Sequence, residues 1–167
     1  MQFRNLATVG GSVFGRFGFS DVLTLLLVMD SYVELYKGGI VPVADFVNMP
    51  YDRDILVRVI VKKTAAHYSY KSVRISKTDF PVLTCAAALT QEGVQAAVGA
   101  RPAKAALVKD AEQLATLPMT AEKAQAFAEY AAGLLPTETN PRGSAAYRTH
   151  LIKVLTARCL TELGGKA

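Results

Sequence analysis

The sequence predicts an α+β fold, in which short strands are followed by a C-terminal pair of helices. Two observations favour it. The middle of the chain carries runs of β-branched and apolar residues that are separated by turn residues. After Arg101-Pro102 the composition changes to helix formers. With 51% hydrophobic and 20% charged residues, a chain of 167 residues can bury a real core as one domain or two small ones.

The N-terminal third reads as a loop, a helix and a hairpin. Ser20 is a plausible N-cap, and Asp21 places a carboxylate at the positive end of the helix dipole. The helix over residues 22–29 is apolar almost all round, so we expect it to be buried. A strand at 32–36 then turns through Lys37-Gly38-Gly39 into a second strand at 40–43. Residues 45–54 form an irregular connection that contains a proline.

The rest of the chain predicts a sheet covered by helices. Further strands are expected at residues 55–61, 68–73, 82–89 and 94–98. The strand at 82–89 carries small alanines that let a helix pack closely against it. Helices are expected at 109–117, from the Thr120 cap to Gly133 or soon after, and from the Ser144 cap to Gly164-Gly165.

The net charge of +5 makes a nucleic acid a possible partner, but the charge pattern does not favour one. The chain shows neither an RNA-binding aromatic signature nor a helix-turn-helix pattern. A phosphate-bearing cofactor and acidic partner subunits explain the basic excess equally well. Most basic residues are scattered among acids, apart from one small group: Arg58, Lys62, Lys63, Lys71, Arg74 and Lys77.

Neither a metal site nor a membrane segment is indicated. Cys85 and Cys159 have no second ligand at metal-binding spacing, so both are expected to be core thiols. His67 and His150 are equally isolated. The most apolar run is much shorter than the roughly 20 residues that span a bilayer, and the N-terminus does not have the pattern of a signal peptide. We therefore expect a cytoplasmic protein.

The segment Arg4-Asn5-Leu6-Ala7-Thr8-Val9-Gly10-Gly11-Ser12 is the strongest candidate for chemistry. Paired glycines allow phosphate oxygens to approach backbone N–H groups closely. Thr8 and Ser12 add hydroxyl groups on either side. The spacing matches neither a dinucleotide fingerprint nor a P-loop, so an ordinary tight turn accounts for the glycines as well.

The longer pattern narrows these alternatives. The glycine segment, followed by Ser20-Asp21 and an apolar helix, resembles the second flavin loop of the FAD-binding (medium) subunit of molybdenum hydroxylases, the xanthine dehydrogenase and carbon monoxide dehydrogenase family. Residues 52–61 resemble the strand that closes the family's flavin domain. Residues 70–83 resemble the entrance to its C-terminal domain, and residues 144–148 resemble the start of its last helix. The resemblance therefore covers essentially the whole chain.

The resemblance implies a site for FAD. Thr8 to Ser12 would line the pyrophosphate, and Asp21 would bind a ribose or ribityl hydroxyl unless it is only a helix-start carboxylate. Met49 and Lys71 would lie against the flavin ring, although a solvated surface lysine is the alternative for Lys71. The cofactor-binding residues implied in this way are Ala7, Thr8, Gly10, Gly11, Ser12, Phe14, Gly15, Ser20, Asp21, Met49 and Lys71.

The chain also departs from the family pattern. Ser12 replaces the usual Asn, Phe17-Gly18 replaces Ser-Pro, and Arg16 adds a charge that would meet a phosphate. Family members have a preceding α/β subdomain whose own glycine loop holds FAD from the other side. We therefore expect residues 1–62 to be the C-terminal part of a PCMH-type FAD-binding domain and residues 63–167 to be the C-terminal domain. A separate chain is a possible source of the N-terminal FAD subdomain.

The expected function is that of an FAD-binding, electron-transferring oxidoreductase subunit, xanthine dehydrogenase-like, with a molybdenum-cofactor large subunit and a 2Fe-2S small subunit as partners. It would pass electrons from iron-sulfur clusters to NAD, a quinone or oxygen. The alternatives are a non-catalytic interaction fragment that does not bind flavin alone, and a basic nucleic-acid-binding domain. Tyr147, Arg148 and an ion pair between Arg74 and Asp79 are expected to serve structure.

Overall fold

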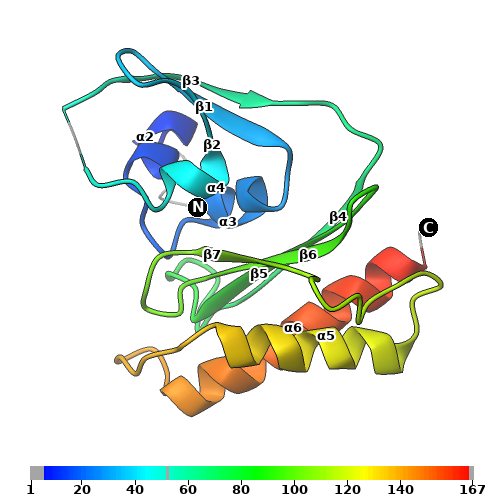
Figure 1. The fold of residues 1–167 in the computed structure, drawn as a ribbon. Helices are drawn as coiled ribbons and strands as arrows, with labels where there is room; N and C mark the ends of the chain where they lie inside the picture. The colour runs from blue at the N-terminus through cyan, green and yellow to red at the C-terminus, as the bar shows by residue number, and fades with distance from the viewer. Residues whose placement is uncertain (1–5, 52, 166–167) are drawn as a thin grey trace.

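The computed structural model describes residues 6–51 and 53–165 and shows two antiparallel sheets with helices (Figure 1). The first part comprises α2 (Val9–Phe14), α3 (Asp21–Leu27), β1 (Ser31–Leu35), β2 (Gly39–Pro42), α4 (Val43–Phe46) and β3 (Leu56–Val61). The second part comprises β4 (His67–Val73), β5 (Leu83–Thr90), β6 (Gly93–Gly99), β7 (Ala106–Lys109), α5 (Ala121–Leu134) and α6 (Ala145–Gly164). The predicted α+β class is confirmed.

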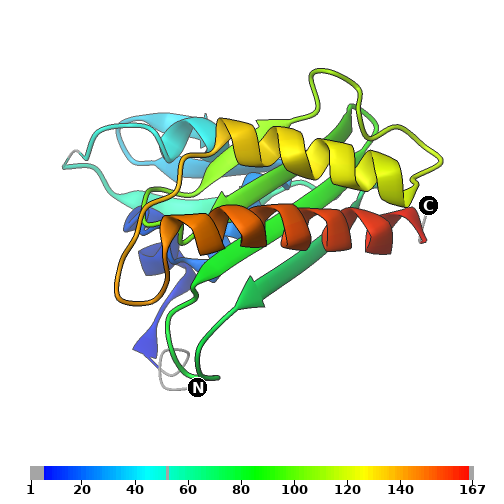
Figure 2. The same ribbon diagram turned by 90° about the horizontal axis from the view of Figure 1, so that it is seen from below.

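The elements form layers around two cores. The first sheet has the order β2-β1-β3, and the second is an antiparallel meander with the order β4-β5-β6-β7. Helices α5 and α6 lie side by side across one face of the second sheet (Figure 2). Helix α3 packs against the other face and lies between the two sheets. The N-terminal segment is therefore held directly on the second sheet.

Small residues allow this close packing of α3. Ala86 and Ala88 of β5 and Ala97 of β6 are completely buried in the core that α3 shares with the second sheet. The close helix packing that the alanines of residues 82–89 predicted is therefore observed. A Cβ atom on Gly99 would lie 2.4 Å from the hydroxyl oxygen of Thr24, a residue of α3. The two layers approach so closely that a side chain at position 99 has no room.

Three helices begin where the sequence predicts. The hydroxyl oxygens of Ser20, Thr120 and Ser144 each accept a hydrogen bond from the backbone N–H three residues later. These caps satisfy one of the unpaired donors at each helix start.

None of the helices in the described part of the chain is long and apolar enough to cross a membrane.

The helix expected at residues 109–117 is wrong. Residues Ala106–Lys109 form strand β7, which pairs with β6, and the segment after it turns irregularly. The carboxylate of Asp110 accepts hydrogen bonds from the backbone N–H groups of Leu114 at 2.9 Å and Ala115 at 2.7 Å. Helix-forming composition is a weak preference, and strand pairing together with this turn overrides it.

The irregular connection expected at 45–54 is partly wrong as well, because helix α4 occupies Val43–Phe46 at its start. Val43 and Phe46 are buried under the first sheet, so one short turn of helix is stabilised by tertiary packing.

Both cysteines are buried, and the expectation that they are core thiols is confirmed.

Arg148 anchors the last helix to the loops around it. Its guanidinium is completely buried and donates hydrogen bonds to the carbonyls of Val82 at 3.0 Å and Glu138 at 2.7 Å, to the carbonyl of Gly143, and to the side chain of Asn140 at 2.5 Å. Burial lowers the pKa of Arg148 below its usual value. The structural role expected for this residue is confirmed.

Replacing Arg148 is expected to destabilise the chain strongly. The variant Arg148→Met leaves several buried acceptors without a donor, so the free energy of unfolding should fall by about 3 kcal/mol. The matched control is Arg142→Met, which removes a half-exposed ion pair with Asp79 and should cost less than about 1 kcal/mol. Urea denaturation followed by circular dichroism measures both. Equal losses would contradict the anchoring role.

Candidate functional site

The glycine segment is helical rather than the loop that the sequence predicts. Gly10 and Gly11 lie in the first turns of α2, and Arg4 and Asn5 lie outside the described residues. The hydroxyl oxygen of Thr8 accepts a hydrogen bond from the N–H of Gly11 at 3.0 Å and so caps the helix. The Thr8 cap explains why the prediction of a loop was wrong, because a Thr three residues before a glycine can start a helix as well as a turn.

One side of α2 is open and rich in hydrogen-bond donors. Ala7, Thr8 and Gly11 are exposed, and Ser12 is half-buried with no hydrogen-bond partner for its hydroxyl among the described residues. The first turn of α2 contains no acidic side chain. The first N–H groups of a helix lack partners within it. Hydroxyl and N–H donors without a nearby carboxylate fit the anionic pyrophosphate of a dinucleotide.

Asp21 lies at the start of α3 and is held by Tyr70 of β4 and by Arg74, which directly follows β4. One Arg74 nitrogen donates to both carboxylate oxygens at 2.6 Å, and the Tyr70 hydroxyl donates to one of them at 2.6 Å. Burial raises the pKa of Tyr70, and the hydrogen bond to Asp21 and its charge raise it further. The start of α3 is therefore joined electrostatically to β4.

The ion pair predicted between Arg74 and Asp79 is not formed by their side chains. Arg74 donates to the main-chain carbonyl of Asp79 at 2.8 Å, and the Asp79 carboxylate pairs with Arg142 at 3.2 Å. Arg74 lies directly after β4 and reaches α3, so Asp21 is its charged partner. The two residues still serve structure, with different partners.

Arg16 is buried, and its guanidinium is directed toward the loop that carries Met49. The residue is only 2% exposed and has a left-handed backbone with φ of 48°. Its guanidinium donates to the carbonyls of Met49 at 2.7 Å and Pro50 at 3.2 Å. It also lies over the rings of Phe46 and Tyr51, at 4.3 and 4.4 Å. The expected phosphate contact is wrong because the cation is taken up by carbonyls and aromatic faces.

Tyr51 is a linking residue that no sequence motif indicated. Its hydroxyl donates to the carbonyl of Gly15 at 2.6 Å, so it links the segment after α2 to the loop that carries Met49. Met49 itself is half-buried and packs against the core that α3 shares with the second sheet. An aromatic residue directly after a proline in an irregular connection was the available signal. The structure thus brings the α2 segment and Met49 together through Arg16 and Tyr51.

Lys71 lies on the other face of the second sheet. It neighbours Tyr70 in β4, and successive side chains of a strand point to opposite faces. Its ammonium donates to the carboxylate of Glu162 in α6 at 2.7 Å, and this hydrogen bond raises the pKa of Lys71. The described structure therefore does not bring Lys71 to Asp21, and its contact with a flavin ring stays a prediction.

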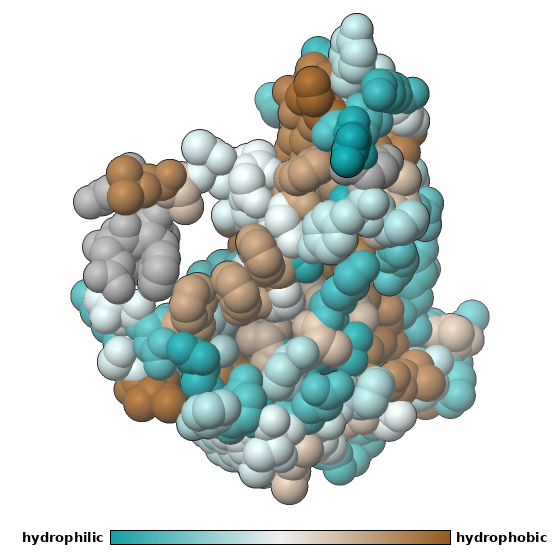
Figure 3. All heavy atoms as spheres, turned by 90° about the vertical axis from the view of Figure 1, so that its left-hand side faces the viewer, coloured by the Kyte–Doolittle hydropathy of each residue, from teal (hydrophilic) through white to brown (hydrophobic). Residues whose placement is uncertain are grey.

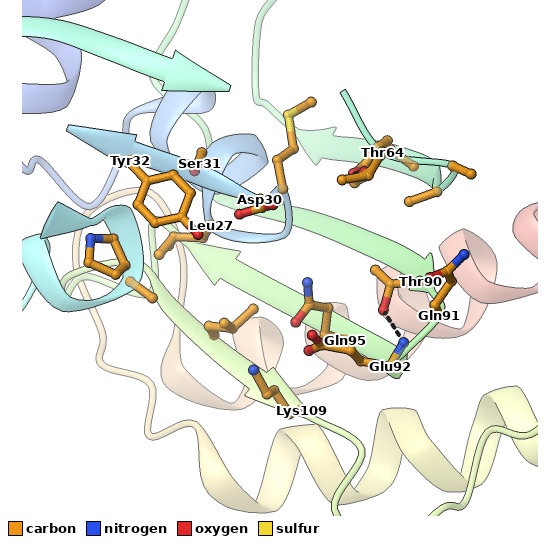
Figure 4. A pocket seen from close by; sticks show the side chains of 17 residues that line it. Leu27, Asp30, Ser31, Tyr32, Thr64, Thr90, Gln91, Glu92, Gln95 and Lys109 are labelled. Carbon is orange, nitrogen blue, oxygen red and sulfur yellow. Dashed lines mark hydrogen bonds between the residues drawn. The ribbon is translucent and has the colours of Figure 1, made fainter. Parts of the chain in front are cut away.

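A cleft of about 490 Å³ lies at the C-terminal end of α3, whereas Asp21 lies at the N-terminal end of that helix. Figure 4 shows Asp30, which directly precedes β1, and Tyr32 of β1 on one side, and Gln95 and Glu92 from the β5–β6 hairpin on the other. Gln95 donates to the carbonyl of Val28 at 3.0 Å, which ties the hairpin to the end of α3. None of the predicted cofactor-binding residues lines this cleft.

The fold and the donor-rich segment at α2 indicate a flavoprotein subunit. Comparison with known proteins gives the family. Residues 1–64 match the model of the FAD binding domain in molybdopterin dehydrogenase, and residues 68–163 match that of the CO dehydrogenase flavoprotein C-terminal domain. The chain belongs to the CO dehydrogenase flavoprotein family, and its cofactor is FAD. The resemblance inferred from the sequence is confirmed.

Individual relatives are similar over part of their length. The uncharacterized protein YgfM of Escherichia coli K12 is 29% identical over 155 residues, which are 92% of this chain and 57% of YgfM. Quinoline 2-oxidoreductase from Pseudomonas putida 86 aligns with a TM-score of 0.81 at 22% identity, over 100% of this chain and 64% of that chain.

Carbon monoxide dehydrogenase from Hydrogenophaga pseudoflava aligns with a TM-score of 0.86 at 20% identity, over 99% of this chain and 63% of that chain. At these identities the structural likeness shows a shared fold. The chain spans less than two thirds of the length of each relative.

Replacing Arg16 is expected to release the loop that carries Met49. The variant Arg16→Met loses the hydrogen bonds to the carbonyls of residues 46–50, so the free energy of unfolding should fall by about 2 kcal/mol. Limited proteolysis should cut this loop faster than in the unchanged chain. Arg53→Met, at an exposed position nearby, is the control and should change neither value. Unchanged proteolysis of Arg16→Met would refute the role as a clamp.

Replacing Asp21 is expected to lower the pKa of Tyr70. Burial keeps that pKa raised, but Asp21→Asn removes the negative charge that raises it further. The absorbance of tyrosinate during an alkaline titration measures the shift, and the difference from a Tyr70→Phe variant isolates this residue from the other tyrosines. A Tyr70 midpoint that does not move would show that the carboxylate is not held as described.

Proposed function

We propose that this chain supplies one half of the FAD site in an electron-transferring subunit of a molybdenum hydroxylase. The observation that carries the proposal is the open, acid-free first turn of α2 in the part of the chain that matches an FAD-binding domain. The backbone N–H groups and hydroxyls from Thr8 to Ser12 would hold the pyrophosphate. Phe14 and Gly15 would continue along the cofactor, with Met49 close by.

Asp21 would accept hydrogen bonds from a ribose or ribityl hydroxyl while it remains paired. A carboxylate has about four lone-pair positions, and Arg74 and Tyr70 use three. The side chain of Asp21 is 47% exposed, which leaves an approach from solvent. Ser20 holds the helix start in place through its cap.

When bound, FAD supplies the redox chemistry, and the protein supplies position and electrostatics. Electrons would pass from iron-sulfur clusters to NAD, a quinone or oxygen, as in a xanthine dehydrogenase-like enzyme. Residues 1–62 would belong to the FAD-binding domain and residues 63–167 to the C-terminal domain. The partners would be a molybdenum-cofactor large subunit and a 2Fe-2S small subunit, together with the polypeptide that completes the FAD site.

Two similar structures support such partners, because both belong to molybdenum enzymes. One is a carbon monoxide dehydrogenase that lacks the Mo-pyranopterin moiety of its molybdenum cofactor, and the other is a Cu,Mo-CO dehydrogenase. The net charge of +5 also suits acidic neighbours.

A second candidate function is that of an interaction fragment which does not bind flavin. One observation favours it: Lys71 is paired with Glu162 on the face of the second sheet that α6 covers, away from Asp21. The polypeptide that completes the FAD site distinguishes the two candidates. With that polypeptide present, a flavin site gains a bound cofactor, whereas an interaction fragment does not.

Flavin absorbance tests the proposal. The chain, purified with the polypeptide that completes the site, should show bands near about 370 and 450 nm. Gly11→Val should reduce bound FAD at least tenfold, because a Cβ atom there would already lie 3.0 Å from the Thr8 hydroxyl oxygen. Gly133→Val is the control, since a Cβ atom on that glycine of α5 meets nothing within 4 Å. A colourless complex would overturn the proposal.

A further inference from the structure

The two cysteines of the chain meet between β5 and α6. Cys85 belongs to β5 and Cys159 to α6, and the helix lies directly on the strand. The sulfur of Cys85 lies 3.4 Å from the hydroxyl oxygen of Thr156, within hydrogen-bonding distance. Cys159 follows Thr156 by three positions, so both side chains project from the same face of α6. The two thiols therefore face each other across the buried layer between helix and sheet.

The contacts of β4 place Cys159 at the same point independently. Lys71 is the cross-strand partner of Cys85, so the two side chains lie on the same face of the sheet. The ammonium of Lys71 donates to the Glu162 carboxylate at 2.7 Å, and the Ser69 hydroxyl donates to the same oxygen at 2.9 Å. Glu162 follows Cys159 by three positions on α6. Contacts to the sheet thus lie one helical turn on either side of Cys159.

The surroundings of the two thiols make them chemically different. The hydrogen bond with Cys85 lowers the pKa of the Cys159 thiol against the opposing effect of burial, and Ser69 and the charge of Lys71 lower it further. The same hydrogen bond raises the pKa of the Cys85 thiol, and burial raises it further. Because the thiolate is the reactive form, Cys159 is the better nucleophile of the pair.

A groove of about 560 Å³ lies beside these residues. Lys71 lines it together with Arg158 and Glu162, which lie on either side of Cys159 along α6. The groove is lined mainly by charged and polar side chains, so water and small polar solutes enter it. Hydrophobic surface gathers on another side of the molecule, where Figure 3 shows brown atoms on the side that carries α2 and the start of β3.

We infer that Cys85 and Cys159 are a modification site, which hydrogen peroxide converts into a disulfide between β5 and α6. The Cys159 sulfur attacks one peroxide oxygen, the O–O bond breaks, and the leaving hydroxide takes up the thiol proton, which gives a sulfenic acid and water. The Cys85 sulfur then attacks the Cys159 sulfur. The S–S bond forms, the S–O bond breaks, and the Cys85 proton leaves with the hydroxyl group as a second water. Two thiols lose two electrons, and one peroxide is reduced to two waters.

Peroxide treatment of the chain tests the inference, with no flavin needed. The oxidised chain should lose both free thiols, become lighter by about 2 Da, and yield one peptide pair linked through Cys85 and Cys159. Dithiothreitol should reverse all three changes. The disulfide closes a long loop, so the thermal midpoint should rise by about 5 °C or more. Two free thiols after treatment, or a link between two chains, would overturn the inference.

Cysteine variants separate the two steps. In Cys85→Ser, oxidation should stop at a Cys159 sulfenic acid that dimedone labels, because the second thiol is absent. In Cys159→Ser, Cys85 should stay unlabelled at the same peroxide concentration, because its raised pKa keeps it protonated. Circular dichroism verifies that both variants are folded. Equal labelling of the two would contradict the order of attack.

A lysine variant tests the cluster around the thiols. Lys71→Met removes the charge that favours the Cys159 thiolate, so disulfide formation should slow by about threefold or more. Lys77→Met, at an exposed position in the turn after β4, is the matched control and should leave the rate unchanged. A rate that Lys71→Met does not alter, or equal slowing by both variants, would contradict this arrangement.

Discussion

The contact between α3 and the alanine-lined face of the second sheet determines how the rest of the molecule is arranged. Side chains larger than alanine at positions 86, 88 or 97 would push the helix away, and overpacking of this kind costs about 1 to 3 kcal/mol. Helix α3 contacts α2 and α4 and shares a core with Val33 and Leu35 of β1, so its position also affects theirs. The absence of side chains at a few positions thus holds the N-terminal segment in place.

The electrostatic link at the start of α3 depends on this packing. Asp21 reaches Arg74 and Tyr70 because the helix lies directly on β5 and β6, and β4 is the strand next to β5. The pair is partly exposed, so its own contribution to stability is small. Its effect is to fix the orientation of a carboxylate at the start of α3, the helix that packs against α2. Under the proposed function, FAD would meet donors for its phosphates on α2 and an acceptor for a hydroxyl on α3.

Helix caps and close packing at small residues could be predicted from the sequence. The face of the sheet or helix on which a given side chain lies could not. The Ser20 and Ser144 caps depend on residues within one turn, and the alanines of β5 report their packing by size alone. Side chains along β4 alternate between the two faces of the sheet. Which face Lys71 occupies therefore depends on the register of the strand, and a shift of one residue would reverse it. Arg16 was misassigned for a similar reason. A cation near a glycine segment suggests an anion, but folding placed it against carbonyls and aromatic rings instead.

Helix α2 connects the candidate site to the first sheet. It carries the donor-rich turn and contacts both α3 and β3. Arg16, which follows α2 closely, holds the loop that carries Met49 through the carbonyls of that loop. A ligand that binds only the folded state stabilises that state. A cofactor bound at this turn is therefore expected to stabilise the contacts of α2 as well as its own site.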